Sequence, residues 1–203
     1  MPFRRFIPVL GLVGGVGSGK SAVANCVKSR RLVAVIDADE AGHQVLTEGS
    51  IKHRIRQRFG ESVIDERGEV VRAALGRLVF GSTREHRQAR TDLEQIVHPR
   101  IKEILQERIE QARAAGSVEA IFLDAAVLFE AGWNDLCNSV VYIDTPLATR
   151  RNRVAESRGW NANVLKERES NQWPLDRKRK AADDIVGNSG CLDDAAKQLE
   201  QLL

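Results

Sequence analysis

The sequence lacks long apolar runs and contains few cysteines, and each shortage excludes a class of protein. No apolar stretch approaches the roughly 20 residues of a membrane span, and proline and glycine end the first apolar run too early for a secretory signal. The three cysteines, Cys26, Cys137 and Cys191, fit neither a disulfide framework nor the spacing of metal ligands, because they are odd in number and far apart. We therefore expect reduced thiols, a cytoplasmic protein and no membrane partner.

The sequence does contain short apolar runs that alternate with helical patterns, which is typical of an α/β fold with a parallel sheet and helices on both faces. We expect strands near residues 7–13, 31–36, 120–124, 139–144 and 184–186. From about residue 51 to residue 116 the strand signal gives way to helical spacing. Because 203 residues suit one domain, we predict a single domain over 1–203 with a mostly helical insertion over 40–116.

Residues 11–21 read GLVGGVGSGKS, which places five glycines within nine positions. Glycine loses more backbone freedom on folding than any other residue, so this cluster needs a local reason. The spacing Gly14-x-x-x-x-Gly19-Lys20-Ser21, between an apolar run and a helical pattern, is that of a phosphate-binding loop. In such a loop the lysine reaches the outer phosphates and the hydroxyl binds Mg²⁺, whereas an ordinary glycine turn requires neither residue. We expect nucleotide contacts at Gly14, Gly15, Val16, Gly17, Ser18, Gly19, Lys20 and Ser21.

Three aspartates follow apolar runs, at the edge where parallel sheets usually bind ligands. Asp124 resembles the Walker-B acid that completes a Mg²⁺ site with Ser21, and capping of a following helix is an equal alternative. Asp37 and Asp39 are two residues apart, so on an extended backbone both side chains share one face. We predict that Asp39 orients and deprotonates an acceptor hydroxyl, with a helix N-cap as the alternative role.

Residues 147–180 hold ten Arg or Lys against four Asp or Glu, while the rest of the chain has a net charge of −3. Such a block binds polyphosphate, nucleic acid or a membrane surface, or it forms a solvated helix face. Beside a nucleotide loop we interpret it as a lid whose guanidinium groups close over the phosphates. Spacing alone does not decide whether Arg150 or Arg153 contacts the transferred phosphate.

These motifs together resemble the dephospho-CoA kinase family over nearly the whole chain. The phosphate loop alone is shared by many families, but the following set in this order is specific. It comprises GLVGGVGSGKS at 11–21, Ile36-Asp37-Ala38-Asp39 with His43, Phe59-Gly60, Arg72-Ala73-Ala74-Leu75, Val79-Phe80, His98-Pro99-Arg100-Ile101, Leu128-Phe129-Glu130, Gln172, KRKAAD at 178–183, and Asn188-Ser189-Gly190.

The resemblance implies a P-loop NTPase of nucleoside-monophosphate-kinase-like architecture, with a five-stranded parallel sheet, a helical substrate-binding insertion and a lid over 147–180. It implies that ATP with Mg²⁺ phosphorylates the ribose 3′-hydroxyl of dephospho-CoA in the last step of coenzyme A synthesis. We expect no nucleic-acid partner and a monomer or weak homo-oligomer. The implied catalytic residues are Asp39, Lys20 and Arg153. ATP is expected to contact Arg150 and Asn188 besides the loop, with Asn188 near the adenine. Dephospho-CoA is expected to contact Asp37, Asp39, His43, Phe59, His98 and Phe129.

The chain departs from the family pattern at three places, none of which removes a required group. Val13 stands where the family usually has Thr, Ala126-Val127 replaces Pro-Leu, and Arg150 stands where Gln is common.

Two rival functions stay open at this point. A kinase of another small hydroxyl or nucleoside monophosphate would share the loop and lid but not the insertion. A nucleotide-dependent switch protein would use the loop without an acceptor, although the sequence has no Asn-Lys-x-Asp stretch for guanine recognition.

Overall fold

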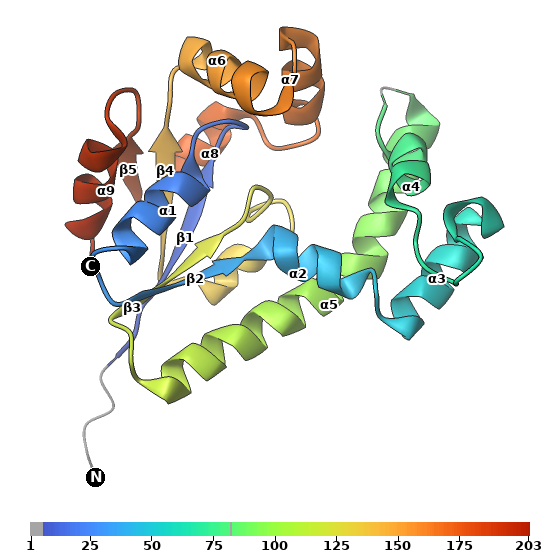
Figure 1. Cartoon of the computed structure of the whole chain (residues 1–203), viewed down its shortest axis with the longest axis horizontal. Coiled ribbons are helices and arrows are strands. Elements are labelled where there is room, and N and C mark those ends of the chain that lie inside the picture. Colours follow the sequence, from blue (N-terminus) through green and yellow to red (C-terminus); the bar gives the residue numbers. More distant parts are fainter. Residues whose placement is uncertain (1–5, 82) are drawn as a thin grey trace. The chain divides into compact units, whose positions relative to one another are not determined.

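The computed structural model describes residues 6–81 and 83–203 and confirms the α/β fold with a five-stranded parallel sheet (Figure 1). The strand order is β2-β3-β1-β4-β5, and every adjacent pair is parallel. The strands are β1 (Val9–Gly14), β2 (Val33–Asp37), β3 (Ala120–Asp124), β4 (Ser139–Asp144) and β5 (Asp184–Gly187). Since β3 lies between β1 and β2, the nearest strand end to Asp37 is that of β3, where Asp37 pairs in register with Asp124.

The chain divides into two compact units, which we describe separately. The sheet unit comprises Met1–Asp37 and Gln106–Leu203, and the helical unit comprises Ala38–Leu105. Helices of the sheet unit are α1 (Lys20–Lys28), α6 (Leu147–Arg158), α7 (Ala162–Glu169), α8 (Leu175–Ala181) and α9 (Leu192–Glu200), with the 3₁₀ helix η2 (Trp133–Leu136). The helical unit contains α2 (Ala38–Val45), α3 (Gly49–Phe59), the 3₁₀ helix η1 (Glu61–Val63), α4 (Arg72–Val79) and most of α5 (Arg84–Ala115), which continues into the sheet unit.

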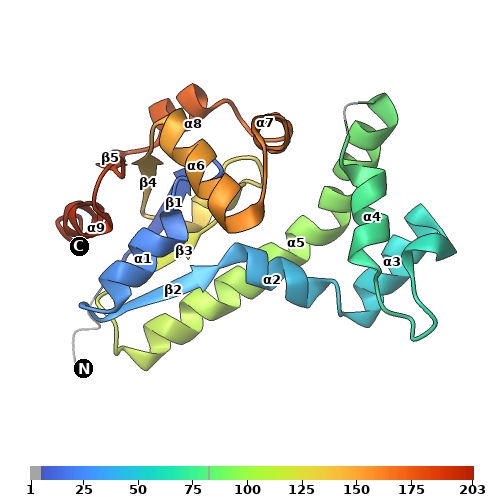
Figure 2. The ribbon, with the colours of Figure 1, turned by 45° about the horizontal axis from the view of Figure 1, so that its top comes forward.

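Apolar side chains of the sheet form the core of the sheet unit against α1 and α9, which pack side by side (Figure 2). All six residues of β1 are buried, as is typical of a central parallel strand covered on both faces. Leu10 and Leu12 of β1 face Val23 and Val27 of α1 in this core. On the other face of β1 a Cβ at Gly11 would lie 2.7 Å from Leu128 and 2.8 Å from Cys137, so glycine lets the loop after β3 pack closely.

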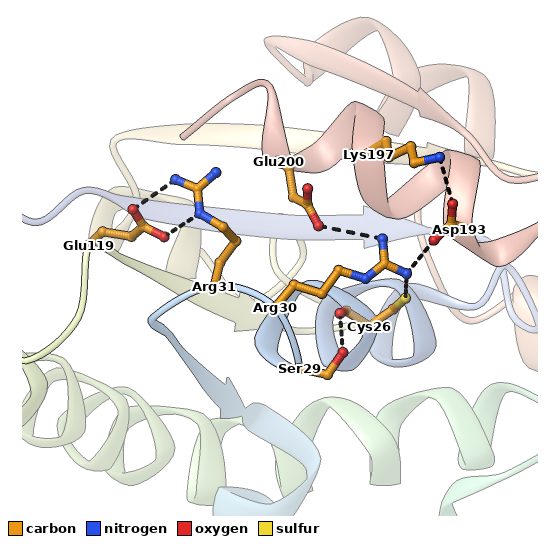
Figure 3. A network of polar contacts seen from close by, with 8 residues as sticks. All are labelled: Cys26, Ser29, Arg30, Arg31, Glu119, Asp193, Lys197 and Glu200. Carbon is orange, nitrogen blue, oxygen red and sulfur yellow. Dashed lines mark hydrogen bonds and ion pairs between the residues drawn. The ribbon is translucent and has the colours of Figure 1, made fainter.

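Exposed polar contacts connect the turn that follows α1 with α9 and with the segment before β3 (Figure 3). The Arg30 guanidinium donates to Asp193 and lies 3.8 Å from Glu200, while Arg31 pairs with Glu119 at 2.7 Å. These pairs are solvent-screened and contribute little to stability individually. Within residues 6–81 and 83–203, no helix has the length and apolar content needed to cross a membrane.

Candidate active site

The predicted phosphate loop connects β1 to α1, in the strand, loop and helix order that its mechanism requires. Gly17 and Gly19 have φ angles of 78° and 85°, which residues with a side chain rarely adopt. A Cβ at Gly19 would also lie 2.6 Å from Asn188 Nδ2. Gly19 is also the N-cap of α1, and it has no side chain that could accept a hydrogen bond from the first amides of the helix. These amides can therefore bind an anion at the positive end of the helix.

The Ser18 carbonyl of this loop accepts three hydrogen bonds from side chains, two of which follow the strands β4 and β5 and one of which lies on α6. Asn188 Nδ2 donates at 2.7 Å, Thr145 Oγ1 at 2.9 Å and Arg153 Nη1 at 3.2 Å. Arg153 Nη2 also donates to the Asn188 carbonyl at 3.2 Å. Arg153 and Asn188, both predicted to bind ATP, thus lie together against the loop. Their contacts with adenine or phosphate stay predictions.

The backbone N–H and C=O of Val16 in the loop are contacted by an ion pair between α6 and α7. Arg150 Nη1 pairs with Glu169 and also donates to the Val16 carbonyl at 3.3 Å, while Glu169 accepts from the Val16 amide at 3.1 Å. Arg150 Nε donates to the Thr145 carbonyl at 3.1 Å. Arg150 is buried, so its guanidinium contacts the loop itself, and a direct contact with ATP stays a prediction. The basic segment 147–180 is consequently more than a solvated helix face, whereas its closure as a lid is untested.

Ser21 and Asp124 meet at the start of α1, where the Ser21 hydroxyl donates to the Asp124 carboxylate. Asp124 is buried and is followed by a turn, so the alternative of capping the next helix is wrong. A hydroxyl and a carboxylate are the oxygen ligands that Mg²⁺ prefers beside substrate phosphates. Within the part of the chain that the structure describes, no group of three or more His, Cys, Asp or Glu side chains is placed to hold a metal ion.

The two aspartates after β2 differ in backbone conformation. Asp37 is the last residue of β2, and α2 begins at Ala38, so Asp39 lies in the first helical turn. The expectation that both side chains share one face of an extended backbone is wrong, because the helix starts between them. The alternative of Asp39 as an N-cap is wrong too, since Asp39 lies inside the helix. A carboxylate in the first turn still benefits from the positive end of the helix.

A second polar network of the sheet unit surrounds Lys178, which is fully buried. Lys178 Nζ donates to the Ala126 carbonyl at 2.6 Å and to Gln172 at 2.9 Å, and it pairs with Glu130 at 2.9 Å. Burial is the main cause that lowers the pKa of Lys178, with Glu130 opposing the shift and Lys20 adding to it. Sequence reasoning placed Lys178 in the cationic lid and assigned Glu130 no role, although both lie in the stretches that carry the family resemblance.

Phe129, predicted to bind dephospho-CoA, stacks on Trp173 beside this network. Their rings are 5.4 Å apart between centroids and nearly parallel, at 8°. The guanidinium of Arg177 lies 3.3 Å from the centroid of the Trp173 ring, a cation–π contact. The Trp173 amide donates to Glu130 at 2.7 Å, which links the stack to Lys178. The loop after β3 and the segment before α8 are therefore held together by both aromatic and ionic contacts.

The helical unit carries the other residues predicted to bind dephospho-CoA. The Arg72 guanidinium lies 2.7 Å from Nε2 of His43 on α2 and donates a hydrogen bond to it. Phe59 lines a pocket of about 340 Å³ with Leu78 of α4 and His86 of α5. His98 is half-buried on α5, and burial lowers its pKa. The structure thus distributes these three side chains over α2, α3 and α5, and their contacts with substrate stay predictions.

Sequence similarity relates this chain to known proteins. The sequence model of the dephospho-CoA kinase family matches residues 8–194. Dephospho-CoA kinase of Bacillus licheniformis is 33% identical over 196 residues, which cover 96% of this chain and 94% of that protein. Dephospho-CoA kinase of Syntrophotalea carbinolica is 35% identical over 196 residues, which cover 96% of this chain and 90% of that protein.

Comparisons of structure confirm the P-loop kinase fold. The crystal structure of TT1252 from Thermus thermophilus has a TM-score of 0.79 at 29% identity and covers 97% of this chain and 96% of its own. Dephospho-CoA kinase from Campylobacter jejuni has a TM-score of 0.69 at 22% identity over 96% of each chain, and that likeness shows the fold alone. Together with the family match over residues 8–194, these relatives lead to one conclusion: the chain belongs to the dephospho-CoA kinase family.

Proposed function

We propose that this chain transfers the γ-phosphoryl group of ATP to the ribose 3′-hydroxyl of dephospho-CoA, which yields ADP and coenzyme A. The observation that carries the proposal is the glycine loop at the start of α1, with Ser21 beside Asp124, in a chain of this family. Phosphoryl transfer depends on positioning and on neutralising charge more than on covalent chemistry. A fixed loop of amides with a lysine and nearby arginines supplies both.

In the proposed mechanism the amides of residues 14–21 bind the ATP phosphates and Lys20 neutralises the outer ones. Ser21 and Asp124 are the residues that would hold Mg²⁺, which would supply positive charge to neutralise the outer phosphates. Arg153 is held beside the loop because its guanidinium donates to the Ser18 and Asn188 carbonyls, which fixes the orientation of the guanidinium. We assign it the role of stabilising charge on the transferred group.

We assign binding of the acceptor mainly to the helical unit, which includes Asp39. His43, Phe59 and His98 would bind dephospho-CoA, with Asp37 and Phe129 contributing from the sheet unit. Asp39 would accept a hydrogen bond from the 3′-hydroxyl and take its proton. A carboxylate is a weak base for an alcohol, but a dissociative path requires proton transfer only late in the reaction. Cytoplasmic location and a monomeric or weakly associating state are further predictions.

The proposal is tested by ADP release with purified protein, ATP and Mg²⁺ under three conditions: with dephospho-CoA, with a nucleoside monophosphate, and without acceptor. Dephospho-CoA alone should give rapid turnover, and ³¹P NMR should detect a new 3′-phosphomonoester. Turnover with the nucleoside monophosphate instead would support the rival kinase. Equal ADP release without any acceptor would indicate a nucleotide hydrolase or switch protein and contradict the proposal.

A further inference from the structure

The Ser18 carbonyl is buried and receives more donors than a carbonyl has lone pairs, because Asn188, Thr145 and Arg153 all point to it. Of these three, only Thr145 has no predicted contact with the substrate. It directly follows β4 and is 6% exposed. Its hydroxyl has one proton and two nearby carbonyls, with Ser18 at 2.9 Å and Asn188 at 3.3 Å. The shorter distance assigns the proton mainly to Ser18.

Holding the Ser18 carbonyl also fixes an amide of the phosphate loop. The described chain contains no cis peptide bond, so the Ser18 carbonyl and the Gly19 N–H point in opposite directions from one planar group. Donors on the carbonyl side therefore aim the Gly19 N–H away from Thr145 and Asn188. They also polarise the peptide, because hydrogen bonds in a low-dielectric interior strengthen one another. The result is a Gly19 N–H with a fixed direction and increased positive charge.

A contact of Thr145 itself holds its backbone in place. Its carbonyl accepts from Arg150 Nε at 3.1 Å, so Thr145 connects the contacts at Val16 with those at Ser18. Thr145 follows β4, and Asn188 follows β5, whose residue Gly187 pairs in register with Asp144 of β4. The sheet thus sets the distance between these donors before any nucleotide binds.

We infer that Thr145 is a positioning residue for ATP, which acts by fixing the Ser18–Gly19 peptide so that the Gly19 N–H is directed at a nucleotide phosphate. The inference rests on the proposed binding of ATP at this loop. It adds a residue to which the motifs of the sequence assign no role. Its physical basis is one buried hydroxyl-to-carbonyl hydrogen bond, and its predicted consequence concerns the phosphates of ATP and not the acceptor.

The test compares Thr145→Val, which keeps the shape but removes the donor, with Thr145→Ser, which keeps the donor. Thr145→Val should raise the KM for ATP and the inhibition constant of inorganic tripolyphosphate by the same factor, about three- to tenfold for one lost hydrogen bond. The KM for dephospho-CoA should change by less than about twofold. Thr145→Ser should recover most of the ATP affinity. Thr91→Val is the matched control, because it removes an exposed hydroxyl bond to the Arg87 carbonyl in the helical unit.

Three results would overturn the inference: an unchanged KM for ATP in Thr145→Val, an equal defect in Thr145→Ser, or equal increases in both KM values. If Thr145→Val does not fold, the wild-type protein still provides a test by ¹⁵N–¹H NMR. On addition of tripolyphosphate the Gly19 amide should shift downfield, and absence of a shift would refute its assigned role. A wild-type protein that binds tripolyphosphate but does not phosphorylate dephospho-CoA would refute the proposed function and leave this inference intact.

Discussion

The sheet unit and the helical unit differ in the burial of their polar side chains. Within residues 6–81 and 83–203, every buried polar or charged side chain belongs to the sheet unit; these are Ser18, Asp124, Thr145, Arg150, Lys178 and Asn188. In the helical unit the contact between His43 and Arg72 is exposed. A buried network has one low-energy arrangement, whereas exposed pairs rearrange at little cost. The comparison suggests a nucleotide site fixed before binding and an acceptor site that adapts.

Lys20→Ala gives the largest expected effect on catalysis, because it removes the cation assigned to the outer phosphates. We expect kcat/KM to fall by about 100- to 1,000-fold, the usual loss when one charge-stabilising donor is removed. Steady-state kinetics with both substrates measures this loss. Lys28→Ala, in the last turn of the same helix, is the control and should retain normal kinetics. Nearly normal turnover in Lys20→Ala would contradict the role assigned to this lysine at the outer phosphates.

Lys178→Met tests whether the buried network stabilises the sheet unit. Removal of one partner leaves Glu130 with an uncompensated charge, which typically costs about 3–5 kcal/mol of unfolding free energy. Chemical denaturation measures that loss, with the exposed Lys180→Met in the same helix as control. If both variants unfold at the same denaturant concentration, the buried ion pair does not stabilise this unit.

Arg72→Gln tests the exposed contact of the helical unit. Without the guanidinium, His43 keeps its place on α2 but loses the partner that orients its ring. Since exposed polar contacts contribute little, we expect the KM for dephospho-CoA to rise by only about two- to fivefold, with the KM for ATP unchanged. Arg67→Gln, on an exposed residue of the same unit, is the control. A larger increase in the KM for ATP than for dephospho-CoA would contradict the assignment of the two units.

Arg30→Ala separates the effect of burial from that of the unit, because it removes two exposed ion pairs that belong to the sheet unit (Figure 3). If burial and not membership of a unit decides the effect, the melting temperature should fall by about 3 °C or less and the kinetics should stay normal. Differential scanning calorimetry measures the first and the ADP-release assay the second. A loss of stability as large as that of Lys178→Met would show that burial is not the deciding variable.

The sheet and the phosphate loop could be predicted from the sequence because their signals are local. Apolar runs mark each strand, and the Gly14 to Ser21 spacing identifies the loop without any knowledge of distant contacts. The start of α2 at Ala38 was harder to predict, since Asp37, Ala38 and Asp39 have no pattern that separates strand from helix. The expected common face of the two aspartates was wrong for that reason.

Residues that act through long-range contacts gave no such signal. Thr145 follows an apolar run as many threonines do, and only the folded chain brings its hydroxyl to Ser18, 127 residues away in sequence. Glu169 and Arg150 likewise read as two charges of a basic segment until they meet at Val16. Lys178 appears in the sequence as one of four consecutive cations, and its complete burial depends on the surrounding loop after β3.

The most direct test of the proposed phosphoryl transfer is a measurement of ATP affinity and turnover in Asp39→Asn. The substitution preserves size but removes the group that is assigned to accept the acceptor proton. We predict that turnover with dephospho-CoA falls by about 100- to 10,000-fold while the dissociation constant of ATP, measured by calorimetry, changes by less than about twofold. Undiminished turnover, or a loss that follows ATP affinity alone, would contradict the account.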